Sequence, residues 1–205
     1  MAEAAKQDNR FWIRDVRIAY AQGIFEAREG KPNADGTRSK PKYGAAFLFD
    51  KGHPALKEIS AAVIAAAKGR WSDKADDMLK MLKAGDRLPV HSGDAKATSA
   101  GYAGNYYLNA GNLIRPLVLD SNKAPLAAAD GKPYSGCYVN AFIEIWAQDN
   151  QHGKRINASL LGVQFVRDGE RLAGGSMATA DDFEQIPSAT DTVGTPVQDA
   201  SSLFA

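Results

Sequence analysis

One segment of the chain, residues 136–147 with the sequence GCYVNAFIEIWA, constrains the fold more than any other. Side chains of a β-strand point alternately to its two faces, so a strict alternation of apolar residues predicts a long strand with one buried face. A buried face needs other parts of the chain to cover it, which places a β-sheet at the centre of the fold. The apolar positions are Cys137, Val139, Ala141, Ile143, Ile145 and Ala147.

Further strands flank a helical insertion. Alternating or aromatic-rich stretches predict strands over residues 10–19, 43–49, 105–110, 111–118 and 155–166. Pro54 suits the start of one helix, and Ser72 suits the N-cap of a second helix that ends at Gly85. Strands before and after a pair of helices favour an antiparallel barrel or sheet over a doubly wound fold. We therefore expect a mainly β domain with helices inserted near residues 54–84.

The two ends of the chain differ from its body. Residues 1–9 predict a flexible N-terminal arm, and strand and helix signals stop after Gly174. Residues 175–205 carry five acids and no Lys or Arg, which predicts a disordered acidic tail behind a domain over residues 10–174. Residues 1–171 hold 25 Lys and Arg against 19 Asp and Glu. This basic excess favours a polyanionic partner.

The composition argues against several classes of protein. No stretch approaches the roughly 18 apolar residues of a membrane span, and the first ten residues contain no apolar signal sequence, so we expect a cytoplasmic protein without a membrane partner. Cys137 is the only cysteine and the three histidines share no ligand spacing, so no disulfide and no metal site is expected.

Signals of catalysis are equally weak. The sequence contains neither a phosphate-binding P-loop motif nor the dinucleotide-binding glycine motif. Asp76 and Asp77 fall in the first turn of a predicted helix, where carboxylates complement the helix dipole. Cys137 lies on an apolar strand face, which suits a buried thiol better than a nucleophile. We therefore expect neither an enzyme nor a cofactor.

Aromatic residues occupy the second face of the strand predicted over residues 136–147. Tyr138, Phe142 and Trp146 share this face with Asn140 and Glu144. An exposed row of rings would let the bases of single-stranded nucleic acid stack, since every base has a π-face. If the two helices cover the row, its rings are a second layer of core. The alternation alone leaves both arrangements open.

A basic loop over residues 28–42 adds phosphate-binding candidates. Its glycine and prolines indicate a loop, and five basic residues in it face two acids. Lys40 and Lys42 stand directly before Tyr43, so two cations adjoin a stacking ring at the start of a strand. This combination suits contact with a sugar–phosphate backbone and a neighbouring base.

Isolated residues elsewhere complete the candidate site. Tyr106 and Tyr107 point to opposite faces of their strand, so one is expected in the core and the other free. Arg115 precedes a proline in an extended segment, and Arg155 begins a strand. The candidate nucleic-acid-binding residues are Lys40, Lys42, Tyr43, Tyr106, Arg115, Tyr138, Phe142, Trp146 and Arg155.

Three segments resemble a known family. They are NYYLNAGNLIRP, KPYSGCYVNAFIEIWAQDN and LLGVQFVRDGERLAGG, followed by DDF in the tail. Together they resemble a family of bacteriophage single-stranded-DNA-binding proteins that was first catalogued as a domain of unknown function, and the resemblance spans residues 11–183. It implies an OB-fold, a small Greek-key barrel used for single strands, with helices inserted between early strands. It also implies a role in phage DNA replication, recombination or repair.

The resemblance and the charge pattern imply partners. We expect single-stranded DNA as the main ligand, with double-stranded DNA as a weaker one and a second copy of the chain as a further candidate. The tail would recruit replication or recombination proteins, although it ends in one acid, Asp199, and a penultimate Phe204, whereas better-known single-strand binders end in clustered acids and a terminal Phe. The alternative is a phage structural or assembly protein whose aromatic row contacts another subunit.

Overall fold

The computed structural model describes residues 9–30 and 38–172. Nearly all of the predicted arm and the whole predicted tail lie outside these residues. The strands are β1 (Arg10–Ala19), β2 (Tyr43–Phe49), β3 (Val90–Ser92), β4 (Tyr106–Asn112), β5 (Leu117–Leu119), β6 (Tyr138–Asn150) and β7 (Gly153–Arg167). The helices are α1 (Ala55–Trp71) and α2 (Ala75–Ala84), with short 3₁₀ turns η1 (Ala21–Ile24), η2 (Ser72–Lys74), η3 (Gly93–Lys96) and η4 (Ala128–Asp130).

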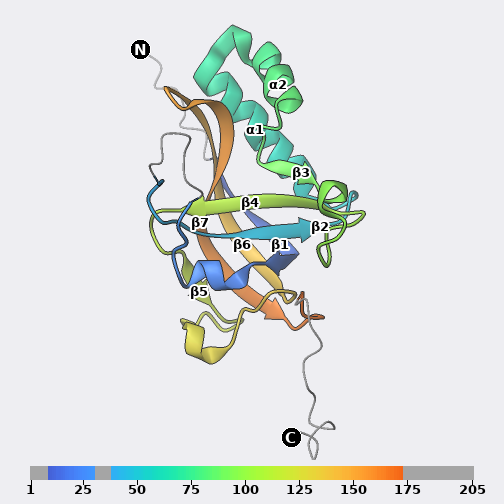
Figure 1. The fold of residues 1–205 in the computed structure, drawn as a ribbon, viewed down its shortest axis with the longest axis vertical. Coiled ribbons are helices and arrows are strands. Elements are labelled where there is room, and N and C mark those ends of the chain that lie inside the picture. The colour runs from blue at the N-terminus through green and yellow to red at the C-terminus, as the bar shows by residue number, and fades with distance from the viewer. Residues whose placement is uncertain (1–8, 31–37, 173–205) are drawn as a thin grey trace, which may run out of the picture. The chain divides into compact units, whose positions relative to one another are not determined.

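The strands form one sheet in the order β3-β4-β2-β1-β6-β7-β5 (Figure 1). The prediction of a mainly β, OB-fold-like domain with inserted helices is therefore confirmed. Within the described residues, however, the sheet is not closed by a ladder between β4 and β7, and β5 pairs with β7 in parallel. The edge of β7 near Gly162 is paired with β5. β4 and β7 lie close to each other, and Asn112 Nδ2 donates to the Leu160 carbonyl oxygen at 3.2 Å.

The core lies on the aliphatic face of β6. Val139 and Ile143 have no exposed surface, as the alternation of this strand predicts. Ile59 of α1 and Leu82 of α2 belong to the same buried cluster. Both helices therefore pack on the aliphatic side of β6. The alternative in which they cover the aromatic row is wrong.

A side-chain hydrogen bond also fixes α1 to the end of β6. Trp71 Nε1 at the last turn of α1 donates to Asp149 Oδ2 at 2.8 Å. Arg70 beside it donates to the Asp149 carbonyl oxygen at 3.1 Å.

Within the described residues, no helix is long and apolar enough to cross a lipid bilayer.

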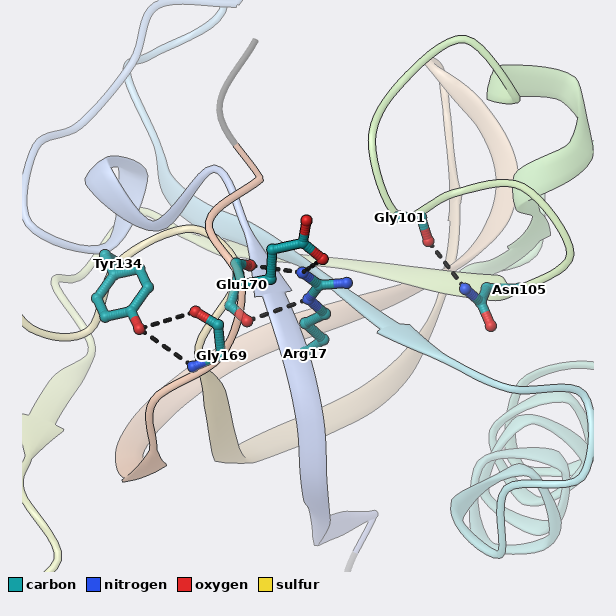
Figure 2. Close-up of polar contacts among 7 residues, drawn as sticks. Arg17, Gly101, Asn105, Tyr134, Gly169 and Glu170 are labelled. Carbon is teal, nitrogen blue, oxygen red and sulfur yellow. Dashed lines mark hydrogen bonds and ion pairs between the residues drawn. The ribbon is translucent and has the colours of Figure 1, made fainter. Parts of the chain in front are cut away.

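The segment that follows β7 returns across β1 and is tied down there (Figure 2). Arg17 Nε donates to the Gly136 carbonyl oxygen at 3.1 Å, and its guanidinium also reaches Glu170. The Tyr134 hydroxyl donates to the Gly169 carbonyl oxygen at 2.9 Å and accepts from the Gly169 amide at 3.1 Å. These contacts make residues 168–172 part of the folded domain.

The thiol of Cys137 should be unreactive in the folded protein. Its side chain is fully buried, and burial raises the pKa of the thiol to about 11, so the nucleophilic thiolate is scarce at pH 8. We expect a disulfide reagent such as Ellman's reagent to leave the native protein unmodified over the time in which it fully labels the protein in denaturant. Rapid labelling of the native protein would contradict this burial.

Candidate nucleic-acid interface

A groove opens between the strand pair β2–β4 and the hairpin ends of β6 and β7. Its floor is made of small residues, which leaves the space above them open. Gly44 and Gly111 lie opposite each other in the β2–β4 ladder, and a Cβ on Gly44 would come within 2.7 Å of the Ala110 carbonyl oxygen. The close approach of the two strands therefore requires glycine at this position. Ala45 and Ala158 continue the floor.

Four exposed cations surround this floor: Arg28, Lys42, Arg87 and Arg155. None of them forms an ion pair with a carboxylate of the described residues, whereas cations elsewhere do, such as Lys132 with Asp168 at 3.0 Å. Backbone hydrogen bonds in both directions between Arg28 and Lys42, at 2.9 and 3.0 Å, hold these two side by side. Unpaired cations around one hollow have the charge that an anion such as a phosphate backbone requires.

One acid lines the groove within the described part of the chain. Asp86 Oδ1 lies 2.8 Å from His91 Nδ1, and the imidazole of His91 in turn stacks on Tyr107 with ring centroids 5.2 Å apart. The carboxylate is thus engaged at the rim and leaves the four cations unneutralised.

Aromatic side chains stand among the cations. Trp146 is 41% exposed, and its Nε1 donates to Ser159 Oγ at 2.9 Å, which fixes the plane of the indole. Tyr43 lines the groove from the start of β2, and Tyr20 lines it from the end of β1 with 49% exposure. Rings beside exposed cations are the combination by which proteins bind single strands with little regard to sequence.

The position of the groove agrees with the use of this type of barrel. OB-folds bind oligonucleotides on the face of their second and third strands, between the loop that follows the first strand and the loop that joins the last two. Here β2 and β4 provide that face. Arg28 and Lys42 come from the connection between β1 and β2, and Arg155 follows the turn between β6 and β7.

Of the residues that the sequence indicates, four meet in this groove: Lys42, Tyr43, Trp146 and Arg155. Lys40 is exposed two residues before Lys42 but does not line the groove. The sequence analysis missed four further residues as site members. The position of Arg28 at the start of the basic loop could have indicated it as a site residue. Nothing in the sequence around Tyr20, Arg87 and His91 indicates that they lie at the site. The missed residues are Tyr20, Arg28, Arg87 and His91.

Tyr106 and Arg115 lie away from the groove. Tyr106 packs against the main core, with the Lys51 ammonium 6.0 Å from its ring centroid. Tyr107 is buried in a second, smaller cluster with Tyr102, as expected for one of the two tyrosines, whereas Tyr106 is half-buried and not free. Residues 93–105 leave the sheet and return to it here, which covers this part of β4. Arg115 is exposed between β4 and β5, with its guanidinium 5.7 Å from the ring of Phe25.

The other two rings of the β6 row are half-buried. Phe142 stacks on Trp12 of β1 with ring centroids 4.9 Å apart. Tyr138 lies under the Arg167 guanidinium, whose carbon is 3.4 Å from the ring centroid. Within the described part of the chain, no three His, Cys, Asp or Glu side chains gather in a way that could hold a metal ion.

Comparisons with known proteins agree with one another. A family model described as "Enterobacter phage Enc34, ssDNA-binding protein" matches residues 10–193. "Putative protein p50" of Acyrthosiphon pisum secondary endosymbiont phage 1 is 40% identical over 184 residues, which cover 87% of this chain and 95% of that protein.

Solved structures show the same fold. The single-stranded DNA-binding protein from bacteriophage Enc34 in complex with ssDNA matches with a TM-score of 0.66 and 23% identity, over 84% of this chain and 97% of that one. A C-terminal truncation of the same phage protein matches with a TM-score of 0.62 and 25% identity, over 83% of this chain and 95% of that one.

Proposed function

Since this chain belongs to the family of the Enterobacter phage Enc34 single-stranded-DNA-binding protein, we propose that it binds single-stranded DNA in the groove between β2–β4 and the β6–β7 hairpin. The observation that carries the proposal is the set of four cations without carboxylate partners around a floor of glycine and alanine, with Tyr43 and Trp146 among them. The protein would coat single strands during phage DNA replication, recombination or repair, without catalysing a reaction.

Binding would tolerate many sequences. The cations would contact phosphates, which are the same in every nucleotide, and the rings would stack on bases. The amides that line the groove are largely engaged with the protein itself. Asn157 Nδ2 donates to Gln148 Oε1 at 3.1 Å, and Gln148 Nε2 donates to Asn150 Oδ1 at 3.2 Å. Few donors and acceptors are therefore left to read the edges of bases.

A salt titration tests this function. We expect oligo-dT to quench tryptophan fluorescence with micromolar or tighter affinity at low salt. Each neutralised phosphate contributes about −0.7 to the slope of log K against log salt, so contacts from four cations predict a slope of about −3. A duplex of the same length should bind more weakly, because its bases cannot reach Trp146. A flat salt response, or no binding of oligo-dT at all, would refute the groove as a DNA site.

A phage structural or assembly protein is the second candidate. It is favoured by three exposed apolar side chains, Leu113 and Ile114 between β4 and β5 and Leu117 at the start of β5, of which Ile114 is 74% exposed. Exposed apolar clusters of this kind mark protein contacts. Stable self-association in sedimentation experiments, together with failure to bind oligo-dT, would favour this candidate. Recruitment of replication or recombination proteins by residues 175–205 stays a prediction, since the tail lies outside the described residues.

A further inference from the structure

A strip of ring and guanidinium groups leads away from the groove along the outer face of β6. Trp146, Phe142 and Tyr138 follow one another at every fourth residue on the face opposite the core. Trp146 also lines the groove, so the strip begins where the groove ends. At about 3.3 Å per residue, the eight steps along the strand from Trp146 to Tyr138 span about 26 Å.

A guanidinium accompanies the strip at both remote positions: Arg14 lies over Trp12, the ring that stacks on Phe142, and Arg167 lies over Tyr138. Trp12 lies opposite Phe142 in the β1–β6 ladder and stacks on it at an interplanar angle of 29°. The Arg14 guanidinium lies 5.6 Å from the Trp12 ring centroid, on an exposed side chain. Arg167 covers Tyr138. A guanidinium plane over a ring is itself a surface on which a base stacks, and its free N–H groups face outward to a phosphate.

The charges of the strip favour an anion at Trp12. The two acids on this face are paired: Glu144 with Arg10 at 3.4 Å and Asp15 with Arg167 at 3.1 Å. Arg14 forms no ion pair with a carboxylate of the described residues. A cation without a carboxylate partner among the described residues therefore lies beside Trp12, one of the two stacked rings.

A hollow lies beside the stack and could admit a base. Its lining comes from β1 and from the start of α1 and consists of Phe11, Trp12, Arg14, Asp15, His53, Pro54, Ala55 and Glu58. Of its two carboxylates, Asp15 is paired with Arg167, and Glu58 is exposed in the first turn of α1. A base that leaves the stack of its neighbours thus meets a ring, a cation and an open space at the same point of the surface. The groove combines the same three features around Trp146.

We propose that Trp12, Arg14 and Phe142 form a second stacking site for single-stranded DNA, reached only by strands long enough to leave the groove and continue along β6. This inference rests on the proposed function, because the groove must hold the first nucleotides. The second site makes affinity depend on strand length. A short oligonucleotide fills the groove alone, whereas a longer one gains the contacts at Trp12.

The test compares (dT)6 with (dT)20 on the full chain. The double variant Trp12→Leu with Arg14→Ala should lose about 10-fold in affinity for (dT)20 and less than about 2-fold for (dT)6, since one stacked base and one phosphate contact are removed. Arg14→Lys keeps the charge but has no planar group, so it should fall between the wild type and Arg14→Ala on (dT)20. Thermal melting confirms that each variant is folded, and Arg14→Ala alone serves if the double variant does not fold.

Arg171→Ala is the matched control. Its guanidinium also lies over a ring, 4.2 Å from the centroid of Tyr134, on an exposed side chain that lines neither the groove nor the hollow at Trp12, so the substitution removes the same charge. We expect it to bind both oligonucleotides as the wild type does. Equal losses for the Arg14 and Arg171 variants on (dT)20, or equal losses on the two lengths, would overturn the second site. Failure of the wild type to bind either oligonucleotide would instead refute the proposed function.

Discussion

Replacing Lys42, Arg87 and Arg155 together with alanine is expected to weaken binding of single-stranded DNA about 100-fold at low salt, which corresponds to ~3 kcal/mol. The three side chains line one groove, are exposed, and have no carboxylate partner among the described residues. Their removal thus costs phosphate contacts without leaving a buried charge behind. The slope of log K against log salt should become shallower by about 2, since each lost contact removes about 0.7.

A second triple variant controls for net charge. Lys57, Lys68 and Lys83 are exposed on α1 and α2 and do not line the groove, so changing them to alanine lowers the charge of the protein by the same three units. We expect this variant to keep its affinity within about 3-fold, because charges distant from the bound strand act only through the screened field of the protein. Similar losses in both variants would mean that binding follows the overall charge and that the groove is not the site.

Ile143→Ala should give the largest loss of stability, with the free energy of unfolding reduced by about 2–5 kcal/mol. Ile143 is fully buried at the centre of β6, opposite Phe11 of β1 and Leu160 of β7. A truncated side chain at this point leaves a cavity that three strands cannot close together. Urea denaturation followed by circular dichroism measures the change.

Val166→Ala is the control for the loss of stability expected in Ile143→Ala. Val166 is 36% exposed on β7, so its truncation removes little buried surface and should change the free energy of unfolding by less than about 0.5 kcal/mol. If both variants lose the same stability, the inward face of β6 is not the main core. At a temperature where Ile143→Ala is still folded, it should bind single-stranded DNA as the wild type does.

The strand over residues 136–147 shows what the alternation of apolar residues can predict. Its alternation predicts the buried face correctly, because the period of two holds along the whole of β6. The alternation of β1 is poorer, since the ladder with β6 shifts register between Ile13 and Val16, and Asp15 there has a φ of 51°. This bulge places Ile13 and Val16 on the same side although they are three residues apart, and the mixed polarity of residues 10–19 follows from it.

The sequence predicts those site residues that combine a suitable side chain with neighbouring positions in the chain. Lys42 and Tyr43 are neighbours in sequence, and both line the groove. Arg87 and His91 reach it only because β3 pairs with the outer edge of β4, and no local pattern indicates that pairing. Tyr106 has an aromatic ring suited to stacking on a base, but it packs against the core.

The sequence by itself determined the class of the fold, the aliphatic face of β6, the helices between β2 and β3, and the basic character of the domain. Each of these depends on periodicity or composition, which are local properties of the chain. The tertiary structure alone decided that the helices cover the aliphatic face of β6 and leave the aromatic row outside. It also decided that cations from two connections and from the start of β7 surround one groove. Contacts between residues far apart in sequence depend on how helices and strands pack. The local sequence pattern of a strand or loop does not specify that packing, because the pattern is the same whichever element lies against it.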